Sequence, residues 1–209
     1  MEFIKLENNK SLVRILSCVE GIKNIDIYIN GSRVYENVQS LSFSDYKNID
    51  CGNLKFEIYQ SLDTTTPILS QMVNIHPNNV YTISLVGNLT NMSLLIITDK
   101  VNKTIKSEES ALRIINLYCS ENNLDIYLNN DMLLDDLAFK QGCDYIDLES
   151  EIYHLKVLSN QDNSVLLPLK VNLKKSRIYT VYLMEKENTL NGVLSVDGNT
   201  YVKDCIIFY

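Results

Sequence analysis

The strongest constraint on the fold is an internal repeat that runs through nearly all of the 209-residue chain. The stretch Asn-Ile-Asp-Ile-Tyr-Ile-Asn at 24–30 returns as Asn-Leu-Asp-Ile-Tyr-Leu-Asn at 123–129, an offset of 99 residues. After a single-residue deletion the offset becomes 98, and Val-Tyr-Thr-Ile at 80–83 then matches Ile-Tyr-Thr-Val at 178–181. A match of this length with one gap predicts two tandem copies of one structural unit.

Each copy has the pattern of a β-sandwich. Between residues 25 and 30 aliphatic side chains alternate with polar ones, which places three isoleucines on one face of a strand and Asp26 and Tyr28 on the other. The pair Asn30-Gly31 then favours a tight hairpin turn. Only two Ala occur in the chain, whereas β-branched and aromatic residues are plentiful. We therefore expect an all-β chain of two tandem immunoglobulin-like antiparallel β-sandwich domains.

The repeat also sets the expected domain boundaries. The first sandwich should span residues 11–100 and the second residues 110–209, where the second includes a C-terminal extension. This extension, residues 202–209, is nearly all apolar at its end and should form an extra strand. It either completes the sheet of its own domain or pairs with a neighbouring molecule, because unpaired strand edges recruit partners. Its candidate interaction residues are Ile206, Ile207, Phe208 and Tyr209.

Charge and hydropathy exclude two classes of protein. The net charge of -7 argues against a nucleic-acid partner, because an acidic surface repels phosphates. No apolar run approaches the ~20 residues that a membrane-spanning helix needs. The first ten residues lack the basic and apolar segments of a secretory signal, so we expect synthesis in the cytoplasm without export.

The sequence offers little for catalysis or for metal binding. Its two histidines, His76 and His154, lie on different elements and have no partners at the spacing of a catalytic triad or a metal site. Three acidic residues at 131, 135 and 136 do not match a calcium loop, which leaves a solvated acidic edge or weak cation binding. We therefore expect no enzymatic activity, no metal and no cofactor. The five cysteines occupy unmatched positions in the two copies, which favours reduced thiols, with intermolecular cross-links as the alternative.

Tyrosine is the most informative residue type, with 13 in the chain. Tyr28 and Tyr127 occupy the same position in the two copies and fall on the polar face of their strand. We expect both to be partly exposed, and they are candidate interaction residues because exposed tyrosines are enriched at interfaces. The Asp-Tyr pairs at 45–46 and 144–145 also recur. They predict a structural role, with the carboxylate capping a turn and the hydroxyl fixing a corner, or else a ligand site in each copy.

The ordered set of motifs resembles the bacterial domain of unknown function 4397 family. That family has a Val-Arg-Ile strand, an Asp-x-Tyr-x-Asn-Gly strand and turn, a Ser-Asp-Tyr step and a late Tyr-Thr-Val strand. The motifs fall in the first copy at Arg14, Asp26, Tyr28, Asn30, Gly31, Ser44, Asp45, Tyr46, Tyr81 and Thr82, and in the second at Arg113, Asp125, Tyr127, Asn129, Asp144, Tyr145, Tyr179 and Thr180. The family loop His-Ala-Ser-Pro-Asp-Ala is replaced here at 16–20 and 116–120. The resemblance implies a fold and a location at the cell surface, and no reaction.

Two classes of function agree with these observations. The first is a non-catalytic structural or interaction protein of a bacterial surface layer, either a spore coat or the cell envelope. Its partners would be other copies of itself or other surface-layer proteins, and a spore coat needs no export. The alternative is a soluble module that binds carbohydrate or another small ligand through exposed Tyr with Asp and Asn beside it. An enzyme is disfavoured, since no nucleophile–base pair is present.

Overall fold

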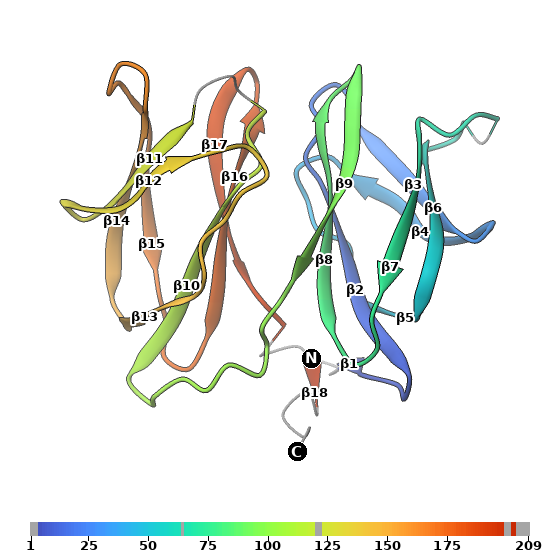
Figure 1. Ribbon diagram of the computed structural model, residues 1–209, viewed down its shortest axis with the longest axis horizontal. Helices are drawn as coiled ribbons and strands as arrows, with labels where there is room; N and C mark the ends of the chain where they lie inside the picture. Colours follow the sequence, from blue (N-terminus) through green and yellow to red (C-terminus); the bar gives the residue numbers. More distant parts are fainter. Residues whose placement is uncertain (1–3, 64, 120–122, 199–201, 204–209) are drawn as a thin grey trace. The chain divides into compact units, whose positions relative to one another are not determined.

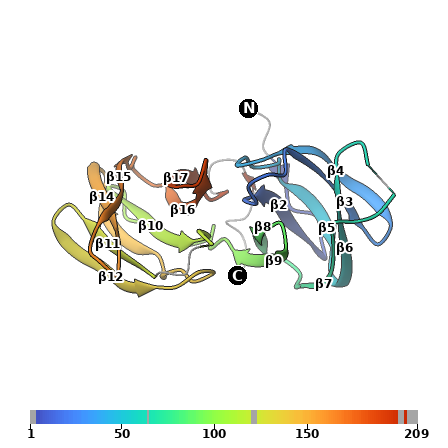
Figure 2. The same ribbon diagram turned by 90° about the horizontal axis from the view of Figure 1, so that it is seen from above.

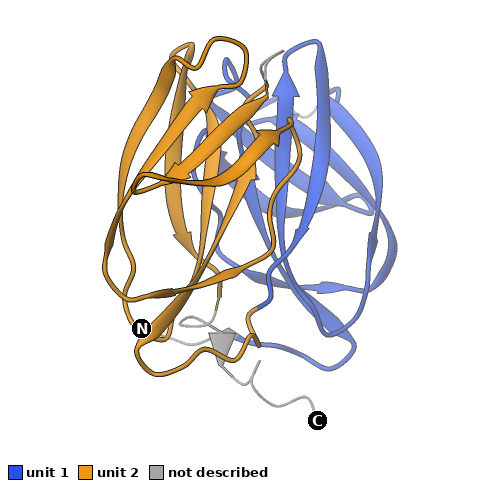
Figure 3. Cartoon of the chain, turned by 60° about the vertical axis from the view of Figure 1, so that its left-hand side comes forward, with its two compact units in different colours: residues 1–100, 201–209 blue, residues 101–200 orange. Residues whose placement is uncertain are grey.

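The computed structural model describes residues 4–63, 65–119, 123–198 and 202–203 (Figure 1). Every regular element within these ranges is a β-strand, which confirms the all-β expectation. Over the same ranges, no helix has the length and apolar character to cross a membrane. The chain divides into two compact units, one of residues 1–100 with 201–209 and the other of residues 101–200 (Figure 3).

The first unit is a sandwich of two four-stranded sheets. One sheet has the strand order β5-β2-β8-β9 and the other has the order β4-β3-β6-β7. Apolar side chains from both sheets, such as Ile15, Ile27 and Phe56, meet between them and form the core. The strands are β2 (Lys10–Ser17), β3 (Asn24–Ile29), β4 (Ser32–Gln39), β5 (Lys47–Asp50), β6 (Gly52–Gln60), β7 (Leu69–Ile75), β8 (Val80–Asn88) and β9 (Asn91–Thr98).

The second unit repeats this architecture strand for strand. Its sheets have the orders β13-β10-β16-β17 and β12-β11-β14-β15, which are the orders of the first unit with every label raised by eight. Figure 2 shows the strands of each unit in two layers. Two tandem sandwiches of equal topology are thus confirmed. The strands are β10 (Glu109–Asn116), β11 (Leu124–Leu128), β12 (Asp131–Leu137), β13 (Ile146–Glu149), β14 (Ile152–Ser159), β15 (Val165–Asn172), β16 (Ile178–Lys186) and β17 (Thr189–Val196).

One strand pair in each unit departs from the expected antiparallel sandwich. Strands β2 and β8 run parallel, from Leu12 opposite Val80 to Ser17 opposite Leu85, and β10 and β16 do the same. Nearly all residues of these four strands are buried, which is typical of parallel strands. The expectation is therefore corrected to mixed sheets. Alternation of side chains indicates faces and carries no information on strand direction.

The C-terminal strand pairs with the N-terminal one. Strand β18 (Val202–Lys203) runs parallel to β1 (Ile4–Lys5) in a separate two-stranded sheet. It therefore belongs with the first unit, whereas the repeat predicted a second domain of residues 110–209. The apolar end of the chain, including Ile206, Ile207, Phe208 and Tyr209, lies outside the described residues.

A buried arginine links the four strands of sheet β5-β2-β8-β9. The Nε of Arg14, on β2, donates a hydrogen bond of 2.8 Å to the hydroxyl of Thr82 on β8. That hydroxyl donates to Asp99 Oδ2 at 2.7 Å, just after β9. Tyr46, just before β5, donates to the same oxygen at 3.1 Å, and its ring centroid lies 4.9 Å from the guanidinium of Arg14. The cluster thus joins residues in or beside every strand of the sheet.

The second unit contains the same cluster. Arg113 Nε donates to the hydroxyl of Thr180 at 2.7 Å, and this hydroxyl donates to Asp197. The hydroxyl of Tyr145 donates to Asp197 Oδ2 at 2.7 Å. The tyrosines of the two recurring Asp-Tyr pairs therefore fix a corner of each sandwich, as predicted. Their partners, Asp99 and Asp197, hold matching positions in the two copies, at an offset of 98 residues.

A β-bulge distorts edge strand β4. Opposite the single residue Asp26 on β3, strand β4 has two residues, Glu36 and Asn37. Asn37 has a φ of 54°, in the left-handed region that Asn tolerates better than most residues. Its backbone N–H donates to Asp26 Oδ1 at 2.8 Å. In the second unit Asp136, with a φ of 53°, donates in the same way to Asp125 at 2.9 Å.

The corner cluster predicts a stability effect. Replacing Tyr46 with Phe removes one hydrogen bond to a buried carboxylate, so the free energy of unfolding should fall by about 1–3 kcal/mol. Denaturant unfolding of the full chain measures the change. Tyr28→Phe is the matched control on a half-buried tyrosine and should change stability by less than about 0.5 kcal/mol. A Tyr46→Phe protein as stable as the wild type would show that the corner does not depend on this bond.

The bulge predicts a pH-dependent effect. Burial alone raises the pKa of Asp26, but hydrogen bonds from Ser61, from the Asn37 amide and from Arg33 outweigh it and hold the pKa below its ordinary value. The carboxylate therefore stabilises the fold fully above about pH 4, and this contribution is lost as the pH falls through the lowered pKa. Asp26→Asn should unfold about 2 kcal/mol more easily at pH 7.

The same measurement repeated at lower pH checks the sign. The difference between Asp26→Asn and the wild type should narrow below about pH 4, because the wild-type carboxyl then takes up a proton. Asp50→Asn, at an exposed carboxylate, is the control and should show little difference at any pH. A difference that stays constant down to pH 2 would contradict the assignment.

Candidate functional site

The outward face of sheet β4-β3-β6-β7 presents a pair of tyrosines. Tyr28 of β3 and Tyr59 of β6 are half-buried, and their ring centroids lie 5.0 Å apart at an interplanar angle of 65°. Edge-to-face packing of this kind holds both rings in place and leaves part of each ring accessible. In the strand register, Tyr28 lies between Arg33 and Glu57, whereas Tyr59 lies opposite Asp26. The polar face predicted from the alternation thus carries a rigid aromatic pair.

A hollow of about 630 Å³ opens on the same unit and includes Asp26, the cross-strand neighbour of Tyr59. Arg33 bridges two carboxylates of the hollow, with its Nη1 at 3.5 Å from Asp26 Oδ2 and at 3.2 Å from Glu36 Oε1. Ser61 donates to Asp26 Oδ1 at 2.7 Å. The hollow is lined by Lys23, Asn24, Asp26, Arg33, Glu36, Asn37, Gln60, Ser61 and Leu62.

The charges of this hollow balance. Its lining holds two cations, Lys23 and Arg33, and two anions, Asp26 and Glu36. Amide and hydroxyl groups supply the other polar atoms, and Leu62 adds a fully exposed apolar side chain. A cavity with matched charges and many hydrogen-bonding groups is suited to an uncharged polar ligand better than to an ion.

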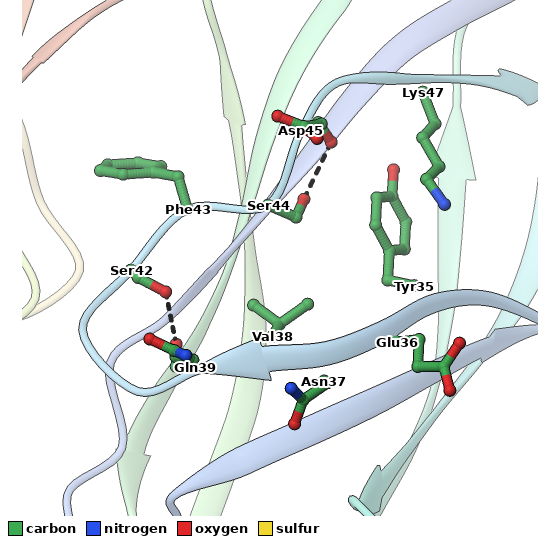
Figure 4. A pocket seen from close by; sticks show the side chains of 10 residues that line it. All are labelled: Tyr35, Glu36, Asn37, Val38, Gln39, Ser42, Phe43, Ser44, Asp45 and Lys47. Carbon is green, nitrogen blue, oxygen red and sulfur yellow. Dashed lines mark hydrogen bonds between the residues drawn. The ribbon is translucent and has the colours of Figure 1, made fainter.

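A second hollow, of about 390 Å³, lies on the other side of β4 (Figure 4). Several of the polar side chains that line it already donate hydrogen bonds to backbone carbonyls of the protein. The hydroxyl of Tyr35 donates to the Val13 carbonyl at 2.7 Å, and Lys47 Nζ donates to the Val34 carbonyl at 2.6 Å. Figure 4 shows the Lys47 side chain extending toward the Tyr35 ring, whose centroid is 5.2 Å from the amine. Both hydrogen bonds join strand β4 of one sheet to a strand of the other sheet, so the residues of this hollow have a structural role.

The matching face of the second unit lacks the aromatic pair. Tyr127 is half-buried, as Tyr28 is, but Leu158 stands where the first unit has Tyr59. Opposite Tyr127, Met132 replaces the arginine that bridges the two carboxylates of the first unit. The two copies therefore share a backbone and differ in the chemistry of their outward faces.

The remaining sequence-predicted residues do not gather into a site. His76 and His154 are exposed and belong to different units. Cys18, Cys51, Cys119 and Cys143 carry free thiols. Within the described part of the chain no group of three or more His, Cys, Asp or Glu side chains is placed to hold a metal.

The residues that complete the first-unit site were not identified from the sequence. Arg33 belongs to β4, whereas Tyr59 and Ser61 lie at the end of β6 and directly after it, and strand pairing brings these two segments beside Tyr28 and Asp26 of β3. One signal was present. Tyr59 directly follows the inward-facing Ile58, as Tyr28 directly follows Ile27, which marks it as an outward-facing residue of its strand.

Comparison with solved structures gives remote likenesses. One, described as alpha-glucan binding by a streptococcal virulence factor, is 8% identical over 93% of this chain and 100% of its own, with a TM-score of 0.29. A second, on alpha-glucan recognition by family 41 carbohydrate-binding modules from streptococcal virulence factors, is 11% identical over 92% and 100%, with a TM-score of 0.26. A DUF3823 family protein from Bacteroides ovatus is 12% identical over 79% and 100%, with a TM-score of 0.23. Scores this low carry no argument about function.

Comparison of sequences is decisive about the family. None of the curated proteins matches the chain. The model of the family described as Domain of unknown function (DUF4397) matches twice, at residues 11–120 and at residues 110–204. These two matches follow the two copies seen in the sequence and in the strand order. The chain therefore belongs to the DUF4397 family and contains two tandem copies of its domain.

Proposed function

We propose that this protein is a non-catalytic binding protein and that its first unit holds a short, uncharged saccharide. The site is the outward face around Tyr28 and Tyr59 together with the adjoining hollow at Asp26. The observation that carries the proposal is a rigid tyrosine pair beside a hollow in which cations and anions balance. A binding module of this kind was the alternative drawn from the sequence.

The chemistry of a saccharide matches both parts of this face. A sugar ring presents C–H groups that pack against an aromatic ring, and the Tyr28–Tyr59 pair offers two such rings held by their mutual contact. Its hydroxyl groups both donate and accept, so they pair equally with Arg33 and with Glu36. The volume of about 630 Å³ lies within the usual range for small-molecule sites.

The same groups are poorly suited to hydrolysis of a sugar. A general acid needs a carboxyl whose pKa is raised toward neutrality. The pKa of Asp26 moves the other way, because the hydrogen bonds from Ser61, Asn37 and Arg33 outweigh the effect of burial. Glu36, the second carboxylate of the hollow, forms an ion pair with Arg33 at 3.2 Å. These facts support binding without turnover.

A role in a bacterial surface layer, with other copies of the chain as partners, stays a prediction. That expectation drew on the tandem sandwiches, the exposed tyrosines, the unmatched cysteines and the apolar C-terminal end, and the last of these lies outside the described residues. Cytoplasmic synthesis and location at a spore or cell surface likewise stay predictions. A saccharide-binding protein would have ligands available in either layer.

Binding measurements test the proposal. Isothermal titration of the full chain against a panel of neutral oligosaccharides should give binding of at least one member. Changing Tyr28 or Tyr59 to Ala should weaken it roughly tenfold or more, because each change removes an aromatic platform. Tyr127→Ala, the matched change in the second unit, should leave the affinity of this site unchanged. Absence of binding to every saccharide, or equal binding by the Tyr28→Ala protein, would refute the proposal.

A further inference from the structure

The outward face of the second unit carries two lysines and a histidine at positions that match the outward face of the first unit. Tyr127 of β11 lies between Met132 on β12 and Lys156 on β14. In the next row of the sheet, His154 on β14 lies opposite Lys170 on β15. All of these side chains except Tyr127 are exposed, and Tyr127 is half-buried. Lys156 is thus the cross-strand neighbour of Tyr127, and His154 and Lys170 lie in the next row of the same face.

At the equivalent positions of the first unit, the charge of the lysine is balanced by a carboxylate. There, Lys55 and Glu57 of β6 form an ion pair at 2.6 Å, and the exposed Met72 lies opposite Lys55. In the second unit, Lys156 stands in place of Glu57 and Lys170 in place of Met72. His154 stands in place of Lys55 and Met132 in place of Arg33, so this face loses one carboxylate and one arginine while its lysines rise from one to two.

These two lysines have no internal counter-charge. Neither Lys156 nor Lys170 forms an ion pair or a side-chain hydrogen bond with any residue that the structure describes. They lie diagonally across neighbouring strands, since Lys156 is opposite Pro168 and Lys170 is two residues further along β15. Their like charges repel one another weakly, because both side chains are exposed to water. The arrangement is unexpected in the half of the chain that holds sixteen acidic and only nine basic residues after position 106.

We propose that this face of the second unit is a site for an anionic saccharide unit. Tyr127 and Met132 offer the surface on which the sugar ring packs, and Lys156 and Lys170 bind its negatively charged group. The inference rests on the proposed function, because it assigns to the second copy a charged version of the first copy's ligand. One chain would then bind a polysaccharide that contains both neutral and anionic units.

Two amines on one face of a sheet recognise a negative group by charge and by hydrogen bonding. Hydrogen bonds to an ionised group contribute more than bonds between neutral groups. A carboxylate or a sulfate on a sugar supplies several acceptor oxygens, which suits two separate ammonium donors. Because the site is exposed, its affinity should fall as the salt concentration rises.

The experiment uses the full chain and three polymers of similar length, namely polygalacturonate, sulfated dextran and unmodified dextran. Affinity electrophoresis and titration at 50 mM salt should show binding of polygalacturonate or of sulfated dextran, and the preferred one identifies the anionic group. Lys156→Glu introduces the residue found in the first unit and should weaken that binding roughly tenfold. Lys170→Met should also weaken it, by a smaller factor. Lys186→Glu is the matched control, because it makes the same charge change at an exposed lysine elsewhere, and it should have little effect.

The outcomes separate this inference from the proposed function. If the chain binds neutral oligosaccharides through Tyr28 and Tyr59 but binds neither anionic polymer, the inference is wrong and the proposed function stands. If Lys156→Glu and Lys186→Glu weaken binding equally, the effect is one of net charge and the inference is also wrong. Equal binding of inorganic polyphosphate and of the anionic polysaccharides would show a plain anion site and overturn the assignment to a saccharide. Circular dichroism and melting curves confirm that each variant is folded.

Discussion

Burial of one arginine in each copy is the constraint on which the rest of the sandwich depends. A guanidinium is tolerated in a protein interior only when its charge and its donors are matched. Arg14 meets this condition through Thr82 and Asp99, and Tyr46 bonds to the same carboxylate. The partners come from different strands of sheet β5-β2-β8-β9, so the sheet has to close in one register before the charge can be satisfied. The cluster therefore selects the register as well as stabilising it.

Because this cluster stabilises sheet β5-β2-β8-β9, the outward side chains of the other sheet of each sandwich can differ between the two copies. Both copies keep the corner cluster and the bulge, which lie in or beside matching strands. Their outward faces differ, because one copy carries a tyrosine pair and the other carries Lys156 and Lys170, which form no ion pair with a described residue. Substitutions on the solvent-facing side of a sheet change its surface chemistry at little cost in stability, because surface substitutions away from buried networks have small effects.

Periodic features of the structure could be predicted from the sequence, and features that depend on strand pairing could not. The repeat predicted two sandwiches, and the alternation around Tyr28 predicted which side chains face outward. The parallel pairing of β2 with β8 was missed, because alternation is the same in either direction. Tyr59 was missed as the neighbour of Tyr28, because their contact needs the register of β3 with β6. The site therefore became visible only with the sheet assembled.

The left-handed residue of the bulge makes the charge of the neighbouring hollow easy to change during evolution. Asn37 and Asp136 hold the same backbone conformation, and the side chain of each accepts a hydrogen bond of 2.7 Å from an asparagine, Asn24 or Asn123. Asn and Asp codons differ at a single base, so one point mutation exchanges amide for carboxylate without disturbing the turn. A lineage that needs a more acidic hollow, or a less acidic one, can reach it in one step.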